Sequence, residues 1–269
     1  MGTLATILKD NWRWRAQIWQ LALFDLRKQS RGAVLGWVWF FIKPAIYVFC
    51  FWFALDVGLR AGNVDPDAPP YILWLCAGIL PWFFMRDILN KGIDVMHRYP
   101  YLVNKVKFPL SAISSIYLIA SMIIQLALQV VLLIIYFVCG QHLDLHLLQI
   151  PLLLVLMYVF WFFFSLFMSP LCAMSKDVKN MMTALSTPFF WLSGVLFDVK
   201  SIDISWIQTI LYFNPITFFV EAFRGATCYK TWFWDNPTVF GCFCIVFVLT
   251  IIFMCISYSK LNEEVSDAL

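Results

Sequence analysis

The sequence predicts an all-α protein that crosses a membrane several times and forms a single domain. Hydrophobic residues make up 62% of the 269-residue chain and charged residues 13%, against about 25% charged residues in soluble domains. The apolar residues are gathered in long runs, and from Phe108 to Leu143 no residue carries a formal charge. This run exceeds the roughly 20 apolar residues that a spanning helix needs. These observations exclude a soluble domain, and we expect no nucleic-acid partner.

The first segment, residues 1–31, is typical of a helix that lies at a membrane interface. Tryptophan suits the headgroup level of a bilayer, and cationic residues suit the cytoplasmic leaflet. Both kinds alternate here: Trp12, Trp14 and Trp19 stand among Lys9, Arg13, Arg15, Arg27 and Lys28. We therefore predict one amphipathic helix over residues 4–28. Scattered charges and the lack of an uninterrupted apolar run argue against a cleavable signal peptide.

Six spans are predicted, the first five within residues 35–196. The expected limits are Leu35–Leu59 for the first span, starts at Tyr71 and Leu110 for the second and third, Leu147–Cys172 for the fourth, an end near Leu196 for the fifth, and Val239–Tyr258 for the sixth. A polar tail, residues 259–269, follows the sixth span. The tail is expected to be cytoplasmic.

Between the fifth and sixth spans, residues 197–236 hold two short apolar pieces. These are Trp206–Phe213 and Ile216–Phe223, separated by Asn214 and Pro215. Each piece is too short to cross about 30 Å of hydrocarbon. We predict a pair of extracellular re-entrant helices, because such backbone is tolerated where protein or a wet cavity covers it.

The distribution of lysine and arginine predicts the orientation. Of the 19 such residues, fourteen lie in segments placed on the cytoplasmic side: six within residues 1–34, five within 86–109, two within 173–180 and one in the tail. Four lie outside, and Lys43 lies within the first span. Under the positive-inside rule, both termini are expected in the cytoplasm.

The chain lacks the sequence signatures of an energy source or a metal centre. It contains no GxxxxGK[ST] motif, so we expect no phosphate-binding loop. His142 and His146 are four residues apart, but Asp144 and the turn context between them do not favour a metal site. The eight cysteines include no CxxC pair, which points to packing residues. Apart from Lys43, the outer and middle parts of the spans carry no ionisable cluster, which argues against an ion-coupled carrier.

Five motifs stand in one order along the chain. They are Arg31-Gly32-Ala33-Val34-Leu35-Gly36-Trp37-Val38-Trp39 with Lys43-Pro44; Gly78-Ile79-Leu80-Pro81-Trp82-Phe83-Phe84; Asn104-Lys105-Val106-Lys107-Phe108-Pro109; Ser175-Lys176-Asp177-Val178; and Asn214-Pro215-Ile216-Thr217 followed by Glu221-Ala222-Phe223-Arg224. With this topology the chain resembles the membrane subunits of type-2 ABC exporters, in the polysaccharide and teichoic-acid branch. The stretch from Trp52 to Leu75 looks most like Gram-positive teichoic-acid permeases. Two departures are Lys176, where relatives usually have Arg, and Lys43, where a neutral polar residue is usual.

The resemblance implies a half-transporter of a bacterial plasma membrane. Two copies would form the pathway, and two ATP-binding subunits, which would hold ATP and Mg²⁺, would dock beneath them. The implied substrate is a lipid-linked glycopolymer, wall teichoic acid or a related polysaccharide, moving outward. Alternatives are an exporter of O-antigen, capsule or a small lipophilic compound. An intramembrane enzyme of envelope assembly would need paired acids or a His/Asp site, and none is evident in the sequence.

The basic segment 97–109 has two interpretations. Apolar residues are interleaved with its cations, so it could dock a soluble partner or lie on anionic lipid. The resemblance favours docking. We predict that Tyr101, Lys105 and Phe108 sit in a cleft of the ATP-binding subunit, as apolar anchors within a charged rim. Lys107, Lys176 and Asp177 are assigned to the same coupling surface.

One face of the first span is predicted to line the pathway. At 100° per residue, this face carries Trp37, Phe40, Lys43, Pro44, Tyr47 and Phe51. A charge at the depth of Lys43 prefers a protein interior or a wet cavity to lipid. The aromatic residues would stack on sugar rings, and Lys43 would favour a phosphate-bearing chain. Phe189 and Trp191 are assigned to the same pathway. The alternative is that Lys43 reaches the headgroups and the stripe is ordinary helix packing.

An outer gate is predicted from Asn214, Pro215, Glu221 and Arg224. Glu221 and Arg224 are three residues apart and so share a helix face. We expect them to hold the re-entrant hairpin closed or to meet the polymer as it leaves. A simple surface pair, worth about 0–1 kcal/mol, is the alternative.

Overall fold

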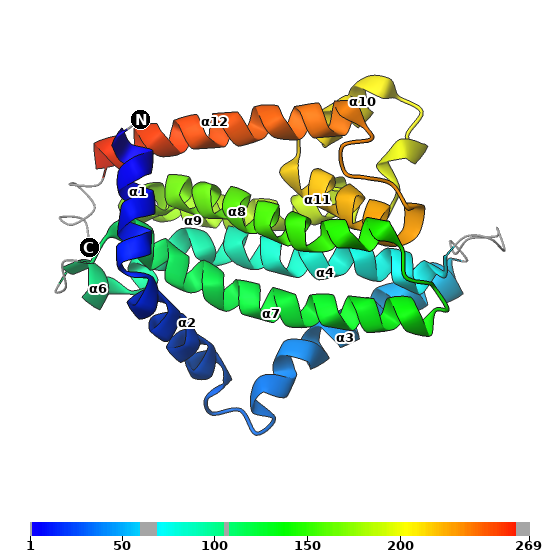
Figure 1. Cartoon of the computed structure of the whole chain (residues 1–269), viewed down its shortest axis with the longest axis horizontal. Coiled ribbons are helices and arrows are strands. Elements are labelled where there is room, and N and C mark those ends of the chain that lie inside the picture. The colour runs from blue at the N-terminus through cyan, green and yellow to red at the C-terminus, as the bar shows by residue number, and fades with distance from the viewer. Residues whose placement is uncertain (1, 60–68, 105–107, 262–269) are drawn as a thin grey trace.

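The computed structural model describes residues 2–59, 69–104 and 108–261, which form a bundle of helices without a strand in those ranges (Figure 1). The α-helices are α1 Gly2–Arg13, α2 Arg15–Ser30, α3 Trp39–Trp52, α4 Tyr71–Asn90, α5 Val95–Arg98, α6 Pro100–Asn104, α7 Leu110–Val138, α8 Gln149–Met174, α9 Lys176–Leu192, α10 Ser205–Tyr212, α11 Pro215–Arg224 and α12 Pro237–Leu261. We call the two ends of the bundle the α1 end and the α11 end, after the short helices found there (Figure 1).

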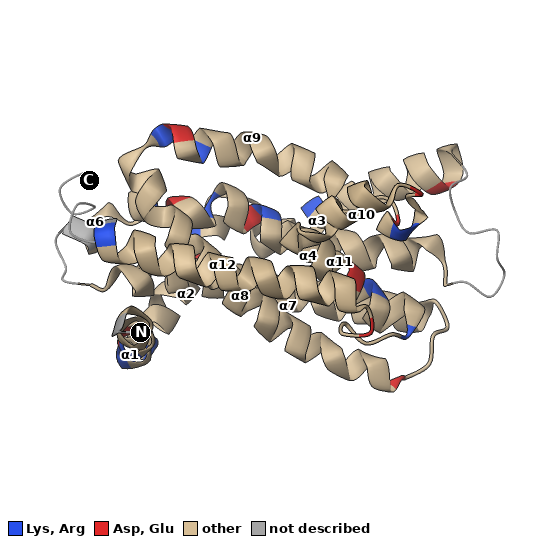
Figure 2. Ribbon diagram, turned by 90° about the horizontal axis from the view of Figure 1, so that it is seen from above, with Lys and Arg blue, Asp and Glu red and all other residues tan. Residues whose placement is uncertain are grey.

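Five helical segments are long and apolar enough to cross a membrane. They are Gly36–Gly58, Tyr71–Arg98, Leu110–Val138, Leu145–Met174 and Pro237–Lys260. Lys, Arg, Asp and Glu gather toward the two ends of the bundle, with few along its middle (Figure 2). This arrangement fits a hydrocarbon layer around the middle of the bundle. The chain is therefore an all-helical, multi-pass membrane protein, as the sequence predicts.

The predicted fifth span is shorter in the structure than expected. α9 has 17 residues, Lys176–Leu192, and Ser193 and Gly194 follow in a turn. Gly194 adopts a φ of +68°, a left-handed conformation that ends the helix before the apolar run stops at Leu196. The count of six spans therefore stays a prediction.

The predicted amphipathic helix is two helices. The chain turns at Trp14, whose φ of −96° and ψ of 10° depart from helical geometry. α1 crosses the end of the bundle and contacts α7 and α12, whereas α2 runs along α7 (Figure 1). The turn places the Trp14 ring 4.9 Å from the ring of Phe108. The prediction of one helix over residues 4–28 is wrong because this tertiary contact overrides the continuous amphipathic pattern.

α4 is the central helix of the bundle and α3 the most peripheral one. In the segment that contains α4, 78% of an 18-residue apolar stretch is buried within the chain, whereas the corresponding share for the segment that contains α3 is 11%. α4 contacts α3, α7, α8, α9 and α11. A helix that is apolar all round belongs in a core or in lipid, and the structure assigns these two environments to α4 and α3 respectively.

Two short helices, α10 and α11, match the predicted re-entrant pieces within one or two residues. Asn214 caps α11, since its Oδ1 accepts from the Ile216 backbone N–H at 3.1 Å, and Pro215 occupies the first helical position. α11 packs on α4 and α8, whereas α10 contacts α12 (Figure 1). The Asn-Pro pair therefore splits the helices as the sequence predicts.

Candidate functional site

The elements predicted to meet an ATP-binding subunit lie together at the α1 end. Lys179 Nζ of α9 is 2.6 Å from Asp94 Oδ2, which precedes α5. Arg98 Nη2 of α5 donates to both carboxylate oxygens of Asp25 on α2, at 3.2 Å each. Asp25 is 2% exposed, and Gln29 Nε2 also donates to it at 2.8 Å. These contacts tie α2, the segment around α5, and α9 into one surface.

A second carboxylate joins α4 to α7 at the same end. Asp87 Oδ2 accepts from the hydroxyls of Tyr117 at 2.6 Å and Ser121 at 2.9 Å, and its Oδ1 pairs with Lys91 Nζ at 2.9 Å. Three donors therefore surround this carboxylate, as expected for a charge at membrane depth. Asp87 consequently acts as a structural anchor between the two helices.

The predicted coupling residues have different environments. Tyr101 is 64% exposed, and Lys176 and Asp177 are exposed at the start of α9. Phe108 is 7% exposed and meets Trp14 edge-on. The structure thus corrects the prediction for Phe108, whose ring packs against Trp14 at the α1–α2 junction instead of projecting outward. Lys105 and Lys107 lie outside the described residues.

A cavity of about 750 Å³ lies among α2, α3, α4, α7 and α9 toward the α1 end. Its wall combines aromatic, cationic and polar side chains. These include Gln29, Trp39, Phe40, Lys43, Phe83, Phe84, Arg86, Asp87, Asn90, Lys91, Arg98, Ser121, Gln125, Thr183, Ser186 and Thr187. A further space of about 360 Å³ shares Trp39, Phe40 and Lys43 with this wall. Lys43 thus borders open space, one of the two environments expected for it.

The predicted aromatic stripe of the first span divides into two parts. Phe40 and Lys43 line the cavity, while Trp37 is exposed and meets Phe40 edge-on at 5.8 Å. Tyr47 packs on Phe83 at 5.5 Å and is 5.0 Å from Phe51. The outer half of the stripe packs against other aromatic rings within the chain, and its place in a pathway between two copies stays a prediction.

Phe190 organises that packing. It is buried between Phe189, which is half-buried, and Trp191, which is exposed. Its ring lies 6.0 Å from Tyr47 and 5.4 Å from Phe51. Phe189 and Trp191 are absent from the wall of the 750 Å³ cavity, and Phe190 joins α9 to α3 in their place. The sequence offered no signal to choose among three adjacent aromatic residues.

Arg224 forms a clamp at the α11 end. Its side chain is 0% exposed, and its guanidinium donates to the carbonyls of Gly194 and Val195 at 2.6 Å each and of Trp74 at 3.3 Å. The guanidinium carbon lies 3.4 Å from the centre of a Trp74 ring. Gly78 provides the space for the guanidinium, because a Cβ at this position would lie 2.7 Å from Arg224 Nη2. Arg224 thus joins α11, α4 and the turn after α9.

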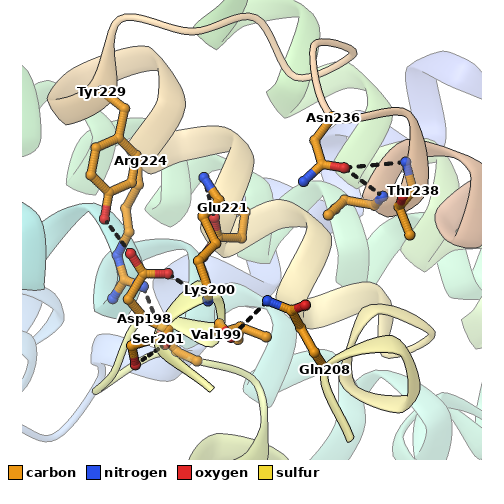
Figure 3. Close-up of polar contacts among 12 residues, drawn as sticks. Asp198, Val199, Lys200, Ser201, Gln208, Glu221, Arg224, Tyr229, Asn236 and Thr238 are labelled. Atoms are coloured by element: carbon orange, nitrogen blue, oxygen red, sulfur yellow. Dashed lines mark hydrogen bonds and ion pairs between the residues drawn. The ribbon is translucent and has the colours of Figure 1, made fainter. Parts of the chain in front are cut away.

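Polar contacts around the clamp extend it to the segment after α9 (Figure 3). Glu221 Oε2 lies 3.4 Å from Lys200 Nζ. Trp74 Nε1 donates to the Tyr229 hydroxyl at 2.7 Å, and that hydroxyl donates to Asp198 Oδ2 at 3.1 Å. Burial raises the pKa of the Tyr229 phenol, which therefore keeps the proton that it donates.

The expected Glu221–Arg224 pair is therefore replaced by separate partners. Their three-residue spacing holds, but the long arginine side chain reaches the turn after α9, while Glu221 turns to Lys200. Asn214, besides capping α11, donates from Nδ2 to Ser193 Oγ at 2.8 Å. The residues predicted as an outer gate thus fasten the hairpin to α4 and α9 in this structure.

Sequence reasoning missed three residues that the structure brings forward. Arg86 and Gln125 line the cavity, and Trp74 supports the clamp. Gln125 had a weak signal as an amide within a long uncharged span, but Gln129 in the same span carries the same signal. Arg86 was counted only as a charge, and Trp74 was one tryptophan among thirteen.

We compared the chain with known protein families and with individual proteins. The family model described as "ABC-2 type transporter" matches residues 16–227, which include α2, the cavity helices and the clamp. An O-antigen export system permease protein RfbA from Myxococcus xanthus is 20% identical over 223 residues, covering 81% of this chain and 83% of the relative. A protein of the same name from Klebsiella pneumoniae is 22% identical over 203 residues, covering 74% and 75%. The chain belongs to the ABC-2 type transporter family and is the permease component of an exporter.

Proposed function

We propose that this chain is the membrane half of an ATP-driven exporter that moves a lipid-linked cell-surface glycopolymer out of the cytoplasm. Two copies would enclose the pathway, and two separate ATP-binding subunits would supply ATP and Mg²⁺. The names of the relatives support O-antigen-type polysaccharide over wall teichoic acid. The observation that carries the proposal is the cavity at the α1 end, where aromatic faces line one space with two cations, Lys43 and Arg86, that form no ion pair with a described residue.

The cavity suits a polymer of sugars better than a compact lipophilic compound. Aromatic faces such as those of Trp39, Phe40 and Phe83 can stack on sugar rings in many registers. Hydroxyl side chains of Thr183, Ser186 and Thr187 on α9 can exchange hydrogen bonds with sugar hydroxyls. An envelope-assembly enzyme is disfavoured because the acid in this wall, Asp87, is held by three donors.

Coupling to ATP hydrolysis would pass through the α1 end, which we place in the cytoplasm with both termini. Tyr101, Lys176 and Asp177 offer exposed contacts there. α9 begins at this surface with Lys176 and lines the cavity from Thr183, about 10 Å further along at 1.5 Å per residue. Movement of the ATP-binding subunit would therefore move a wall of the cavity directly. At the α11 end, the clamped hairpin would close the outer mouth.

The test is ATPase measurement on the complex purified with its ATP-binding subunit. We expect an undecaprenyl-linked O-antigen-type polysaccharide to stimulate hydrolysis more than undecaprenyl-linked teichoic acid. Stimulation by teichoic acid alone would overturn the choice of polymer. Failure of every lipid-linked polymer to stimulate hydrolysis or to be moved into sealed vesicles would overturn the proposed function.

A further inference from the structure

We infer that the cavity at the α1 end contains a binding site for the phosphate of a lipid headgroup, formed by Lys43, Arg86 and Gln125. This inference rests on the proposed function and specifies which part of the substrate this chain recognises. The three side chains come from α3, α4 and α7, so the site would join three helices around one ligand.

The charges of the cavity wall leave a positive surplus. Lys91 is neutralised by Asp87 at 2.9 Å, and Arg98 by the buried Asp25 at 3.2 Å. Lys43 and Arg86 line the same cavity, and neither forms an ion pair with an acid in the described parts of the chain. Two cations that face a space within the membrane region call for an anionic ligand or solvent.

Gln125 supplies a second, independent observation. Its side chain is 1% exposed and lines the cavity, and neither its Nε2 nor its Oε1 has a hydrogen-bond partner among the described residues. Buried amides in folded proteins are nearly always hydrogen-bonded, and the hydrocarbon layer offers no compensating water. In this conformation both atoms are enclosed beneath the cavity wall, so the Gln125 side chain would have to rotate to present its free donor and acceptor to a ligand.

The depth of these groups suits a headgroup that enters from the α1 end. Gln125 is 15 residues beyond Leu110, about 22 Å along α7 at 1.5 Å per residue. Arg86 stands in the last turns of α4, nearer the α1 end. The planar guanidinium of Arg86 can bind a phosphate with two parallel hydrogen bonds, and Lys43 can add a point charge. A diphosphate that links a polyprenyl tail to a sugar carries two ionised phosphates, which matches the two unpaired cations.

Two lipids could present this chemistry: the polyprenyl-linked substrate and a membrane phospholipid. The experiment therefore uses the full-length chain in phosphatidylcholine nanodiscs and three probes. Undecaprenyl pyrophosphate is compared with undecaprenol, which has the same tail without phosphate, and with phosphatidylglycerol, which has a phosphate on a different tail. Affinity for each probe is measured by native mass spectrometry or by competition with a labelled analogue.

We expect undecaprenyl pyrophosphate to bind, and undecaprenol to bind at least tenfold more weakly. Arg86→Gln and Gln125→Leu should each weaken pyrophosphate binding by roughly tenfold or more, the usual effect of losing a hydrogen bond to a charged group. Gln129→Leu is the matched control, because Gln129 is also buried and unpartnered on α7 but lies outside the cavity wall. Lys260→Gln removes an exposed cation at the same end of the bundle as the cavity.

Thermal unfolding distinguishes a binding role from a structural one. Gln125→Leu should keep or raise the unfolding midpoint, because it removes an unsatisfied buried amide. Arg86 is exposed, so its substitution leaves the core intact even if the Gln125 variant folds poorly. Equal binding of undecaprenol and undecaprenyl pyrophosphate, or unchanged affinity in Arg86→Gln and Gln125→Leu, would overturn the inference.

Three further outcomes have definite meanings. Equal binding of phosphatidylglycerol with the same dependence on the variants would support a phosphate site and assign it to a membrane lipid. Pyrophosphate binding without polymer-stimulated ATPase would refute the proposed function and leave the site in place. Normal polymer export without phosphate-dependent binding would refute the site and leave the function in place.

Discussion

The two ends of the bundle differ in how they treat polar groups inside an apolar protein. At the α11 end, Arg224 is completely enclosed, and four backbone carbonyls and the face of Trp74 surround its guanidinium. At the α1 end, Lys43 and Arg86 border a cavity without an ion-pair partner in the described chain, Lys43 lies 6.0 Å over the Trp39 ring, and the amide of Gln125 has no hydrogen-bond partner there. A satisfied buried network fixes the arrangement of its helices, whereas unsatisfied groups beside a cavity remain available to a ligand. The comparison separates the part that holds the fold from the part that would bind substrate.

The largest expected effect is the loss of the Arg224 clamp. Arg224→Met leaves four backbone carbonyls without this donor and separates α11 from the turn after α9. We expect a loss of about 3–5 kcal/mol of stability, as when one partner of a buried polar network is removed. The measurement is thermal unfolding of the detergent-purified chain. The exposed Lys230→Gln is the control at the same end of the bundle. A change below 1 kcal/mol would mean that Arg224 is not a structural clamp.

The next effect concerns the buried ion pair at the α1 end. Arg98→Met leaves Asp25 buried with Gln29 as its remaining side-chain partner. We expect a loss of about 2–3 kcal/mol and weaker ATPase coupling, because α2 and α5 would no longer move together. Asp25→Asn in the same chain should restore part of the stability. A double variant no more stable than Arg98→Met would argue that the pair does not carry this coupling.

A smaller effect is expected where α4 makes room for the clamp. The added methyl group of Gly78→Ala would lie 2.7 Å from Arg224 Nη2 and 3.2 Å from the Val195 carbonyl oxygen. Overpacking of this kind costs about 1–3 kcal/mol. In the Arg224→Met background the same substitution should cost less, since the guanidinium is gone. Double-mutant thermal unfolding measures this interaction, and additive effects would show that the methyl group and Arg224 do not compete for space.

The smallest effect on stability and a large effect on transport are expected at Lys43. Lys43→Gln removes a charge that borders open space, so stability should change by no more than about 0.5 kcal/mol. Polymer-stimulated ATPase and export should fall, and Lys260→Gln should leave both unchanged. Full export by the Lys43→Gln variant would support the alternative, in which Lys43 only reaches the lipid headgroups.

The helices were largely predictable because their limits have local causes. Pro109 precedes α7, and Asn214 with Pro215 starts α11. Such capping and hydropathy signals act over a few residues. The turn at Trp14 was missed because it depends on another element, the ring of Phe108. The early end of α9 had a local signal that the hydropathy pattern outweighed, namely Gly194 just past the helix, whose positive φ ends it.

The site was less predictable because its geometry is tertiary. Helical spacing placed Glu221 and Arg224 on one face, but each side chain is long enough to reach a partner on another element. Lys43 lines a cavity, in keeping with the few favourable environments of a charge within a span, and its role in the pathway stays a prediction. That Arg86 and Gln125 share this cavity follows from the packing of α3, α4 and α7, which no local pattern encodes.

The most direct test of the central claim is cysteine accessibility along α3 and α9. In a chain with its eight native cysteines replaced, single cysteines would stand at Lys43 and Thr183, which line the cavity, and at Ile46 and Phe49, which are exposed on the outer face of α3. We predict that a membrane-impermeant thiol reagent labels the first two positions, that lipid-linked polymer protects them, and that the other two stay unlabelled in the bilayer. The account would be contradicted if the reagent labelled cysteines at positions 46 and 49 but failed to label those at positions 43 and 183 even without polymer.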